Sequence, residues 1–212
     1  MVHHGTLKQK RHILRGYTHK NIKNIYGTME GYGVNLEGYS KKFPTTYGEI
    51  TVDGLKLLAR AYHDIHPITT YPSSQQVFYD LGSGIGKNVI MMASLVPTIH
   101  STGIELVKDR HDMAMLAYQK ITDKKIKSRI SLHCGSLLDY PLSDAAWIFV
   151  SNLCFPPKLN KLLATKLAKE VHATTLIACS NALDHASFHL LKTVKIPMTW
   201  DENSNVYIYE KR

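Results

Sequence analysis

The hydrophobic pattern of residues 77–180 alternates between short apolar runs and longer amphipathic stretches. The stretches at residues 87–96, 108–121 and 159–171 carry apolar side chains at helical spacing. The runs between them have the length of strands and lie at residues 77–81, 100–106, 130–134, 145–151 and 174–180. Strands that alternate with helices form a parallel sheet with right-handed crossovers. The pattern therefore predicts an α/β fold with a doubly wound sheet.

Two flanking regions complete this prediction. Residues 52–65 have apolar side chains at helical spacing, and Thr51 before them is a good N-cap. Residues 189–195 and 205–210 alternate like strands and predict a closing hairpin. With this hairpin the predicted sheet has seven strands, most of them parallel.

Composition narrows the class of protein. The chain has 212 residues, of which 44% are hydrophobic and 20% charged, as is typical of globular proteins. No apolar run approaches the ~20 residues of a membrane-spanning helix, and no apolar segment follows the basic N-terminus as in a secretory signal. Three cysteines without C-x-x-C spacing and scattered histidines predict neither a disulfide framework nor a metal site. We expect a protein of a reducing compartment that is neither secreted nor in a membrane.

The net charge of +9 is concentrated near the N-terminus. Residues 1–45 hold eight Lys or Arg and two Glu, a balance of +6. Residues 6–26 predict one or two basic helices, and the glycine- and tyrosine-rich residues 27–49 predict a loop. Because lysine and arginine neutralise phosphates, this basic segment is expected either to contact a polyanion or to be a solvated leader.

The sharpest chemical signal is the glycine-rich turn at residues 80–86, Asp-Leu-Gly-Ser-Gly-Ile-Gly, between a predicted strand and its helix. Gly82 and Gly84 let the backbone turn tightly and approach a ligand, to which the helix N-terminus presents N–H groups. Glu105 ends the next strand, 23 residues after Gly82. A carboxylate at this place accepts both hydroxyls of a ribose. These features predict a cofactor that contains adenosine.

The acid before the turn selects among such cofactors. Nicotinamide dinucleotides require G-x-G-x-x-G, and the charge of Asp80 would repel their pyrophosphate. The same charge attracts the α-amino group of S-adenosylmethionine, so we predict this cofactor and methyl transfer. A turn that served packing alone would leave Asp80 and Glu105 unexplained. Ser136 and Leu137 follow the third strand, where class I methyltransferases usually hold the adenine, and Leu137 offers an apolar contact to the ring.

The segment after the fourth strand, Ser-Asn-Leu-Cys-Phe-Pro-Pro at residues 151–157, bears on the methyl acceptor. Enzymes that methylate amino groups of DNA carry Asp/Asn-Pro-Pro-Tyr/Phe at this place. Here the aromatic residue precedes the prolines, and two residues separate Asn152 from Phe155. This order disfavours a nucleobase as the acceptor.

The chain resembles the Dot1 family of histone lysine methyltransferases, which are class I enzymes without a SET domain. Residues 43–49, Phe-Pro-Thr-Thr-Tyr-Gly-Glu, are similar to that family's YGE-containing loop over the cofactor. Residues 77–86 are similar to its VFVDLGSGVG, residues 103–105 match its G-V-E, and residues 148–156 are similar to its IFVNNFAFGP. Trp200, followed by Val206 and Tyr207, is a weaker fifth match.

This resemblance implies roles for single residues. Tyr47 and Glu49 are expected over the methionine end of the cofactor, with Lys87 near it at a position where the family often has Gln. Ser151, Asn152, Phe155 and Tyr207 are the expected catalytic residues of a lysine channel. Ser151 or Asn152 would orient the amine, and the aromatic walls would favour its neutral form by desolvation. Ser151 and Leu153 depart from the Asn and Phe of the family.

The resemblance also implies the function. We expect a class I S-adenosylmethionine-dependent protein-lysine N-methyltransferase that acts as a monomer on histone H3 in the nucleosome core. Residues 1–50 would form a basic segment with the cofactor-covering loop, and residues 51–212 the catalytic core. The expected compartment is the nucleus, or the host nucleus for a viral protein, and otherwise the cytoplasm. The expected DNA contacts are Lys8, Lys10, Arg11 and Arg15.

Two alternatives remain at this point. The first is a class I methyltransferase that acts on a non-histone protein, an RNA or a small molecule. The second is a catalytically dead module that keeps the fold and docks on nucleic acid. Intact Asp80, Gly82, Gly84 and Glu105 argue against the second.

Overall fold

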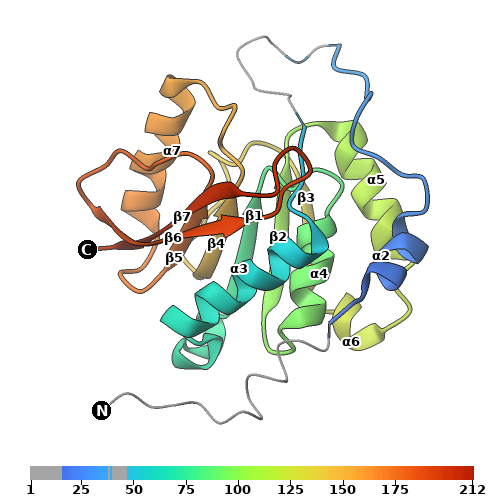
Figure 1. Ribbon diagram of the computed structural model, residues 1–212, viewed down its shortest axis with the longest axis horizontal. Helices are drawn as coiled ribbons and strands as arrows, with labels where there is room; N and C mark the ends of the chain where they lie inside the picture. The colour runs from blue at the N-terminus through green and yellow to red at the C-terminus, as the bar shows by residue number, and fades with distance from the viewer. Residues whose placement is uncertain (1–15, 38, 40–46) are drawn as a thin grey trace.

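Five parallel strands and a hairpin form one sheet in the computed structural model, which describes residues 16–37, 39 and 47–212 (Figure 1). The sheet order is β3-β2-β1-β4-β5-β7-β6, and β7 is antiparallel to both of its neighbours. The predicted α/β fold with a mostly parallel seven-stranded sheet is confirmed. The strands are β1 (Val77–Leu81), β2 (His100–Glu105), β3 (Ile130–Cys134), β4 (Ala145–Val150), β5 (Leu176–Cys179), β6 (Phe188–Ile196) and β7 (Ser204–Lys211).

Helices pack on both faces of this sheet. α7 begins two residues before the apolar pattern predicts, because Pro157 is well suited to the first helical position. The short helix α6 was not predicted. The described α-helices are α2 (His19–Tyr26), α3 (Val52–Ile65), α4 (Lys87–Leu95), α5 (Lys108–Gln119), α6 (Lys124–Lys127) and α7 (Pro157–Glu170), and two single-turn 3-10 helices, η1 (Ile68–Thr70) and η2 (Ser73–Gln75), connect α3 to β1.

Two apolar cores separate the helices from the sheet. In the first, the ring of Tyr62 in α3 stacks on Trp147 of β4 at 5.1 Å, and its hydroxyl donates to the Ile148 carbonyl at 2.5 Å. In the second, Leu163 and Leu167 of α7 pack against the opposite face. All six residues of β4 are buried, because this strand lies between the two cores.

The basic segment contributes α2, the part of residues 6–26 that is helical in the described chain. Thr18 and Asn21 form a capping box at its start. Ile22, Ile25 and Tyr26 are buried in the first core, and the Tyr26 hydroxyl donates to the Ile85 carbonyl at 3.1 Å. α2 is therefore anchored beside the glycine-rich turn. Residues 1–15 lie outside the described residues.

The arrangement of strands fixes where a ligand binds. The carboxyl ends of β1, β2, β3 and β4 meet at one edge of the sheet, and the strand order reverses between β1 and β4. Ligands of open α/β sheets bind at the carboxyl edge beside such a reversal.

Candidate functional site

The glycine-rich turn follows β1 with the geometry that its sequence predicts. Gly82 and Gly84 have φ values of 88° and 55°, which residues with a β-carbon rarely adopt. The N–H groups of Gly82 and Ser83 donate to the Ile104 carbonyl at 2.9 and 3.0 Å. A β-carbon on Gly84 would lie 2.5 Å from the ring of Tyr47. The turn is thus tied to the end of β2 and closely covered by Tyr47.

Asp80 is the charged residue beneath this turn. It is 1% exposed, and its Oδ2 has no hydrogen-bond partner among the described residues. Burial raises the pKa of Asp80 well above its usual range. A hydrogen bond with the Asn88 side chain offsets part of this rise, and the nearby charges of Glu105 and Glu49 add to it. A buried carboxylate oxygen without a donor is unfavourable. The position is therefore complementary to a ligand that brings a cation or an N–H group.

Glu105 stands at the end of β2, beside the turn. Its Oε2 accepts from the Gly84 N–H and its Oε1 from the Val107 N–H, both at 2.8 Å. These two bonds fix the carboxylate in the wall of a cavity. Each oxygen keeps a second lone pair, with which the pair can accept vicinal hydroxyls.

This cavity, of about 240 Å³, opens at the carboxyl edge of the sheet. It receives residues from the ends of four strands, from the loop that contains Tyr47 and from the β6–β7 connection. Its apolar walls and few polar groups are typical of a cofactor site. Its lining includes Tyr47, Gly48, Gly82, Glu105, Arg110, Ser136, Leu137, Ser151, Leu153, Cys154, Phe155, Leu159 and Trp200.

A smaller cavity adjoins the first and shares Tyr47, Gly48, Gly82 and Ser151 with it. It is lined by two acidic residues, Asp80 and Glu49, and by one cation, Lys87. Lys87 Nζ donates to Glu49 Oε2 at 2.5 Å, and both side chains are mostly buried. Mixed charges of this kind suit the amino and carboxylate groups of an amino acid.

The loop with Tyr47 and Glu49 lies over these cavities. The Tyr47 hydroxyl donates to Glu49 Oε1, and burial raises the pKa of Tyr47, so it remains a neutral phenol. Thr199 anchors the loop: its N–H donates to the Glu49 carbonyl at 2.8 Å, and its Oγ1 accepts from the Glu49 N–H at 3.0 Å. Residues 43–46, the first part of the matching motif, lie outside the described residues.

These groups fit S-adenosylmethionine. The unpartnered Oδ2 of Asp80 suits the α-amino group, the fixed carboxylate of Glu105 suits the ribose hydroxyls, and Leu137 supplies an apolar surface for the adenine. Ser136 lies beside Leu137 in the wall. Asp139, the nearest acid in sequence to this adenine wall, is exposed and does not line the cavity.

The predicted channel residues divide into two groups. Ser151 and Phe155 line the cavity, whereas Asn152 and Tyr207 are not among its lining residues. Asn152 is fully buried: its Nδ2 donates to Asn160 Oδ1 at 2.9 Å and to the Asn181 carbonyl at 3.2 Å, and its Oδ1 accepts from the Asn181 N–H at 2.7 Å. Tyr207 of β7 packs against the second core, because alternate residues of a strand face opposite sides.

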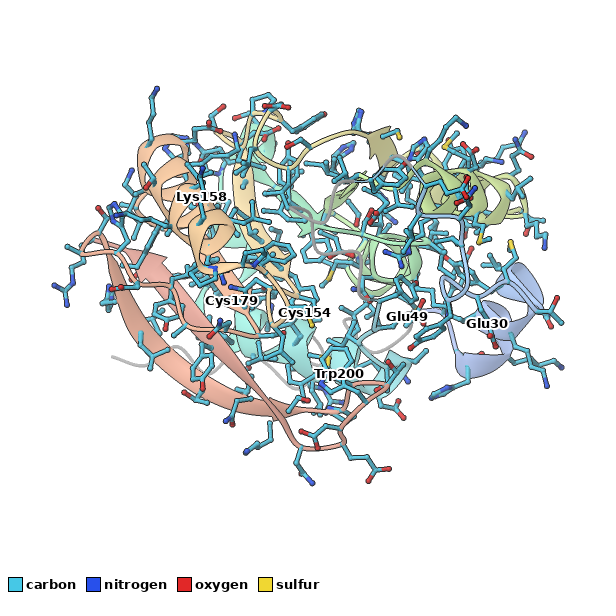
Figure 2. All side chains as sticks on the ribbon, turned by 90° about the horizontal axis from the view of Figure 1, so that it is seen from above. Glu30, Glu49, Cys154, Lys158, Cys179 and Trp200 are labelled. Atoms are coloured by element: carbon cyan, nitrogen blue, oxygen red, sulfur yellow. The ribbon has the colours of Figure 1, made fainter. Side chains whose placement is uncertain are left out.

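Three residues of the cavity carry no local sequence signal or only a weak one. Arg110 in the first turn of α5 resembles an exposed helical cation in the sequence, but it is 6% exposed. Its Nε donates to the Gly31 carbonyl at 3.0 Å, and its guanidinium lies 4.5 Å from the centre of the Tyr47 ring. Leu153 and Trp200 are exposed by 51% and 42% and form an apolar rim. Figure 2 views this side from above, with Glu49, Cys154 and Trp200 near the centre.

The division of the channel residues gives a paired prediction. Phe155→Ala should lower turnover while cofactor affinity stays near wild type, because Phe155 lines the cavity from the segment after β4, which is expected to face the methyl acceptor. Asn152→Ala should instead lower the free energy of unfolding by about 1–3 kcal/mol, because buried partners lose their hydrogen bonds. Calorimetric titration and denaturant unfolding separate the two effects. Normal stability of Asn152→Ala with lost turnover would return Asn152 to the catalytic residues.

Two further properties concern the whole of the described chain. None of the helices in residues 16–37, 39 and 47–212 is long and apolar enough to cross a membrane. Within the same residues, no three His, Cys, Asp or Glu side chains group so as to hold a metal ion.

Comparison with known proteins adds sequence and fold relationships. The family described as "Histone methylation protein DOT1" matches residues 28–197 of this chain. A search of curated proteins finds no significant match. Among solved structures, an RNA methyltransferase from Salinibacter ruber in complex with S-adenosyl-L-homocysteine has 20% sequence identity and a TM-score of 0.53, covering 74% of this chain and 91% of that one.

Two other solved structures have the same fold. The mitomycin 7-O-methyltransferase MmcR has 10% identity and a TM-score of 0.55, and the match covers 76% of this chain and 54% of that one. The StiE O-methyltransferase segment, residues 961–1257, has 8% identity and a TM-score of 0.53, with 74% and 73% covered. At these identities the likeness concerns the fold alone, which is that of class I methyltransferases.

Proposed function

Because this chain belongs to the DOT1 family of histone methylation proteins, and is an S-adenosylmethionine-dependent methyltransferase, we propose that it methylates a lysine of histone H3 in the nucleosome core. The observation that carries the proposal is the family match over residues 28–197. The apolar rim of the cavity, with Leu153 and Trp200 exposed at its mouth, supports a side chain of a protein as the acceptor.

The proposed chemistry is assigned to residues of the cavity. S-adenosylmethionine supplies, when bound, an electrophilic methyl group on a sulfonium. The chain's residues must present a neutral amine, although lysine has a pKa of about 10.4. Phe155, Leu153 and Trp200 would remove water from the ammonium group and so lower its pKa.

Ser151 is the polar group best placed to orient this amine, because it lines both cavities. The residues that line the larger cavity include no histidine and a single carboxylate, that of Glu105. Both oxygens of this carboxylate already accept backbone N–H groups. A dedicated general base is therefore not assigned. Positioning of the amine would supply most of the acceleration.

The substrate class is tested with radiolabelled cofactor and separate pools of nucleosomes, free histones, RNA and small molecules. We expect label in histone protein, with nucleosomes as the best pool. Label in RNA or small molecules, with none in histones, would replace the proposal with a different methyl acceptor. The absence of transfer to every pool would favour the inactive binding module.

The compartment and partners belong to the same proposal. Nucleosomes place the protein in the nucleus, or in the host nucleus if its source is a virus. The proposed DNA contacts Lys8, Lys10, Arg11 and Arg15 lie outside the described residues. We further propose that the protein acts as a monomer. Size-exclusion chromatography with light scattering, which gives the molar mass in solution, tests this.

Replacing these four basic residues by Gln tests their role in DNA binding. Substitution is preferable to deletion of residues 1–25, because α2 begins at His19 and buries Ile22 and Ile25. We expect weaker nucleosome binding. The slope of log affinity against log salt concentration should become shallower by about 0.9 for each phosphate that is no longer neutralised. Activity on a free histone should change little, since that substrate carries no DNA. Equal nucleosome activity at physiological salt would make the segment a solvated leader.

A further inference from the structure

The outer face of α7 carries a row of lysines that the catalytic site does not use. Lys158, Lys161, Thr165 and Lys169 are exposed and follow one another at i+3 or i+4 spacing, which places them on one face of the helix. We call Lys158, Lys161 and Lys169 the α7 stripe. Among the ion pairs of the described residues none involves these lysines, and no exposed position of α7 is acidic.

Helix stability does not account for the α7 stripe. Lys158 lies in the first turn, which has no acidic residue and where the helix dipole disfavours a cation. Lys166 of the same helix shows the contrasting case. It pairs with Glu170 at 2.7 Å in an i,i+4 arrangement, and its side chain is 9% exposed. The helix thus uses one lysine for internal pairing and presents three to solvent.

The α7 stripe begins at the mouth of the cavity. α7 starts at Pro157, and Phe155 and Leu159 on either side of this residue line the cavity wall. Figure 2 shows Lys158 on α7 and Cys154 on the segment that leads into this helix. From Lys158 to Lys169 the helix rises about 16 Å. A partner that follows the α7 stripe therefore reaches the entrance of the site.

We propose that the α7 stripe binds the phosphate backbone of duplex DNA beside the methyl-transfer cavity. Duplex DNA carries one charge per about 1.7 Å of its axis, so a row of three cations about 16 Å long meets phosphates in any register. Such contacts position a protein without reading sequence. This inference rests on the proposed function, because DNA is the polyanion that surrounds a nucleosomal lysine.

The test is fluorescence anisotropy with a short labelled duplex at several salt concentrations. The variant Lys158→Gln/Lys161→Gln/Lys169→Gln removes the α7 stripe and leaves residues 1–15 unchanged. We expect affinity to fall at least about tenfold near 0.1 M salt, and the salt slope to fall by about three, one for each lysine. Methyl transfer to a free histone should stay near wild type, and the melting temperature confirms that the variant is folded.

The matched control is Lys120→Gln/Lys124→Gln/Lys125→Gln, which removes three exposed lysines in and beside α6. α6 directly precedes β3 and so lies at the amino edge of the sheet. In Figure 1 it is at the lower right of the molecule, whereas α7 is at the upper left. We expect this variant to keep its duplex affinity within about twofold, because these lysines are away from the proposed surface.

The outcomes separate the inference from the proposed function. Unchanged duplex affinity of the α7 variant, or an equal loss in the control, overturns the α7 stripe as a DNA surface. Unchanged duplex affinity with reduced nucleosome methylation also overturns it and points to an acidic protein surface instead. Selective loss of duplex affinity supports it even if the wild-type protein methylates no histone, in which case the proposed histone substrate is what fails.

Discussion

Asp80→Asn is expected to weaken S-adenosylmethionine binding by a factor of roughly ten to 150 while making the cofactor-free protein more stable. A hydrogen bond to a charged group contributes about 1.5–3 kcal/mol, which accounts for the loss of affinity. The gain in stability follows because the buried Oδ2 has no partner among the described residues and its charge is desolvated. Removing that charge should raise the free energy of unfolding by about 1 kcal/mol or more.

The gain should depend on pH. The pKa of Asp80 is raised on folding, so the protonated form favours the folded state. The contribution of Asp80 to wild-type stability is therefore most favourable below the unfolded value of 3.8 and is lost as the pH rises through the folded pKa. Asp80→Asn cannot lose a proton here, so its free energy of unfolding should exceed that of wild type by an amount that grows over the same pH range. Thermal unfolding without cofactor, over a pH series, measures the difference.

Asp144→Asn is the matched control for Asp80→Asn. Asp144 accepts a hydrogen bond from the Tyr79 hydroxyl at 2.8 Å and lines neither cavity. We expect this variant to bind the cofactor as wild type does. Wild-type cofactor affinity of Asp80→Asn would instead remove Asp80 from the site.

Glu105→Ala is expected to weaken cofactor binding by about 1.5–3 kcal/mol, which corresponds to a factor of roughly ten to 150. The carboxylate would lose its interaction with the ribose hydroxyls. The Gly84 and Val107 N–H groups would also lose their acceptor, so the glycine-rich turn becomes less ordered. Calorimetric titration with S-adenosylmethionine measures the loss, and unchanged affinity would exclude Glu105 from binding the ribose.

A ligand without the amino-acid portion separates the two acidic residues. Methylthioadenosine keeps the adenosine and lacks the α-amino group. Glu105→Ala should weaken the binding of both ligands, whereas Asp80→Asn should weaken S-adenosylmethionine alone. Parallel losses in both variants for both ligands would mean that the substitutions act through the folding of the turn.

Features that depend on short stretches of sequence could be predicted. The alternation of apolar runs and amphipathic stretches predicts the strands and helices of the sheet. A strand or helix that is buried on one or both faces carries apolar residues at the spacing of that element. The glycine-rich turn is predictable because its positive φ angles at Gly82 and Gly84 favour glycine. Asp80 and Glu105 are predictable as site residues because they lie at the ends of β1 and β2.

Other features depend on contacts between distant segments. Asn152 follows β4 directly, and its side-chain amide forms hydrogen bonds with Asn160 and Asn181. The sequence motif predicts its place beside the site but not these contacts. Tyr207 faces the second core because of the pairing of β7 with β5. Arg110 enters the cavity wall because α5 packs beside the loop with Tyr47, an arrangement that no spacing in the sequence encodes.

Mass spectrometric mapping of nucleosomes incubated with the protein and S-adenosylmethionine tests the central claim most directly. We predict that methyl groups accumulate on a lysine of histone H3, and that the Glu105→Ala protein at equal concentration adds far fewer at limiting cofactor. Unmodified histones after incubation with active protein, or equal modification by wild type and Glu105→Ala under those conditions, would contradict the proposed enzyme and its site.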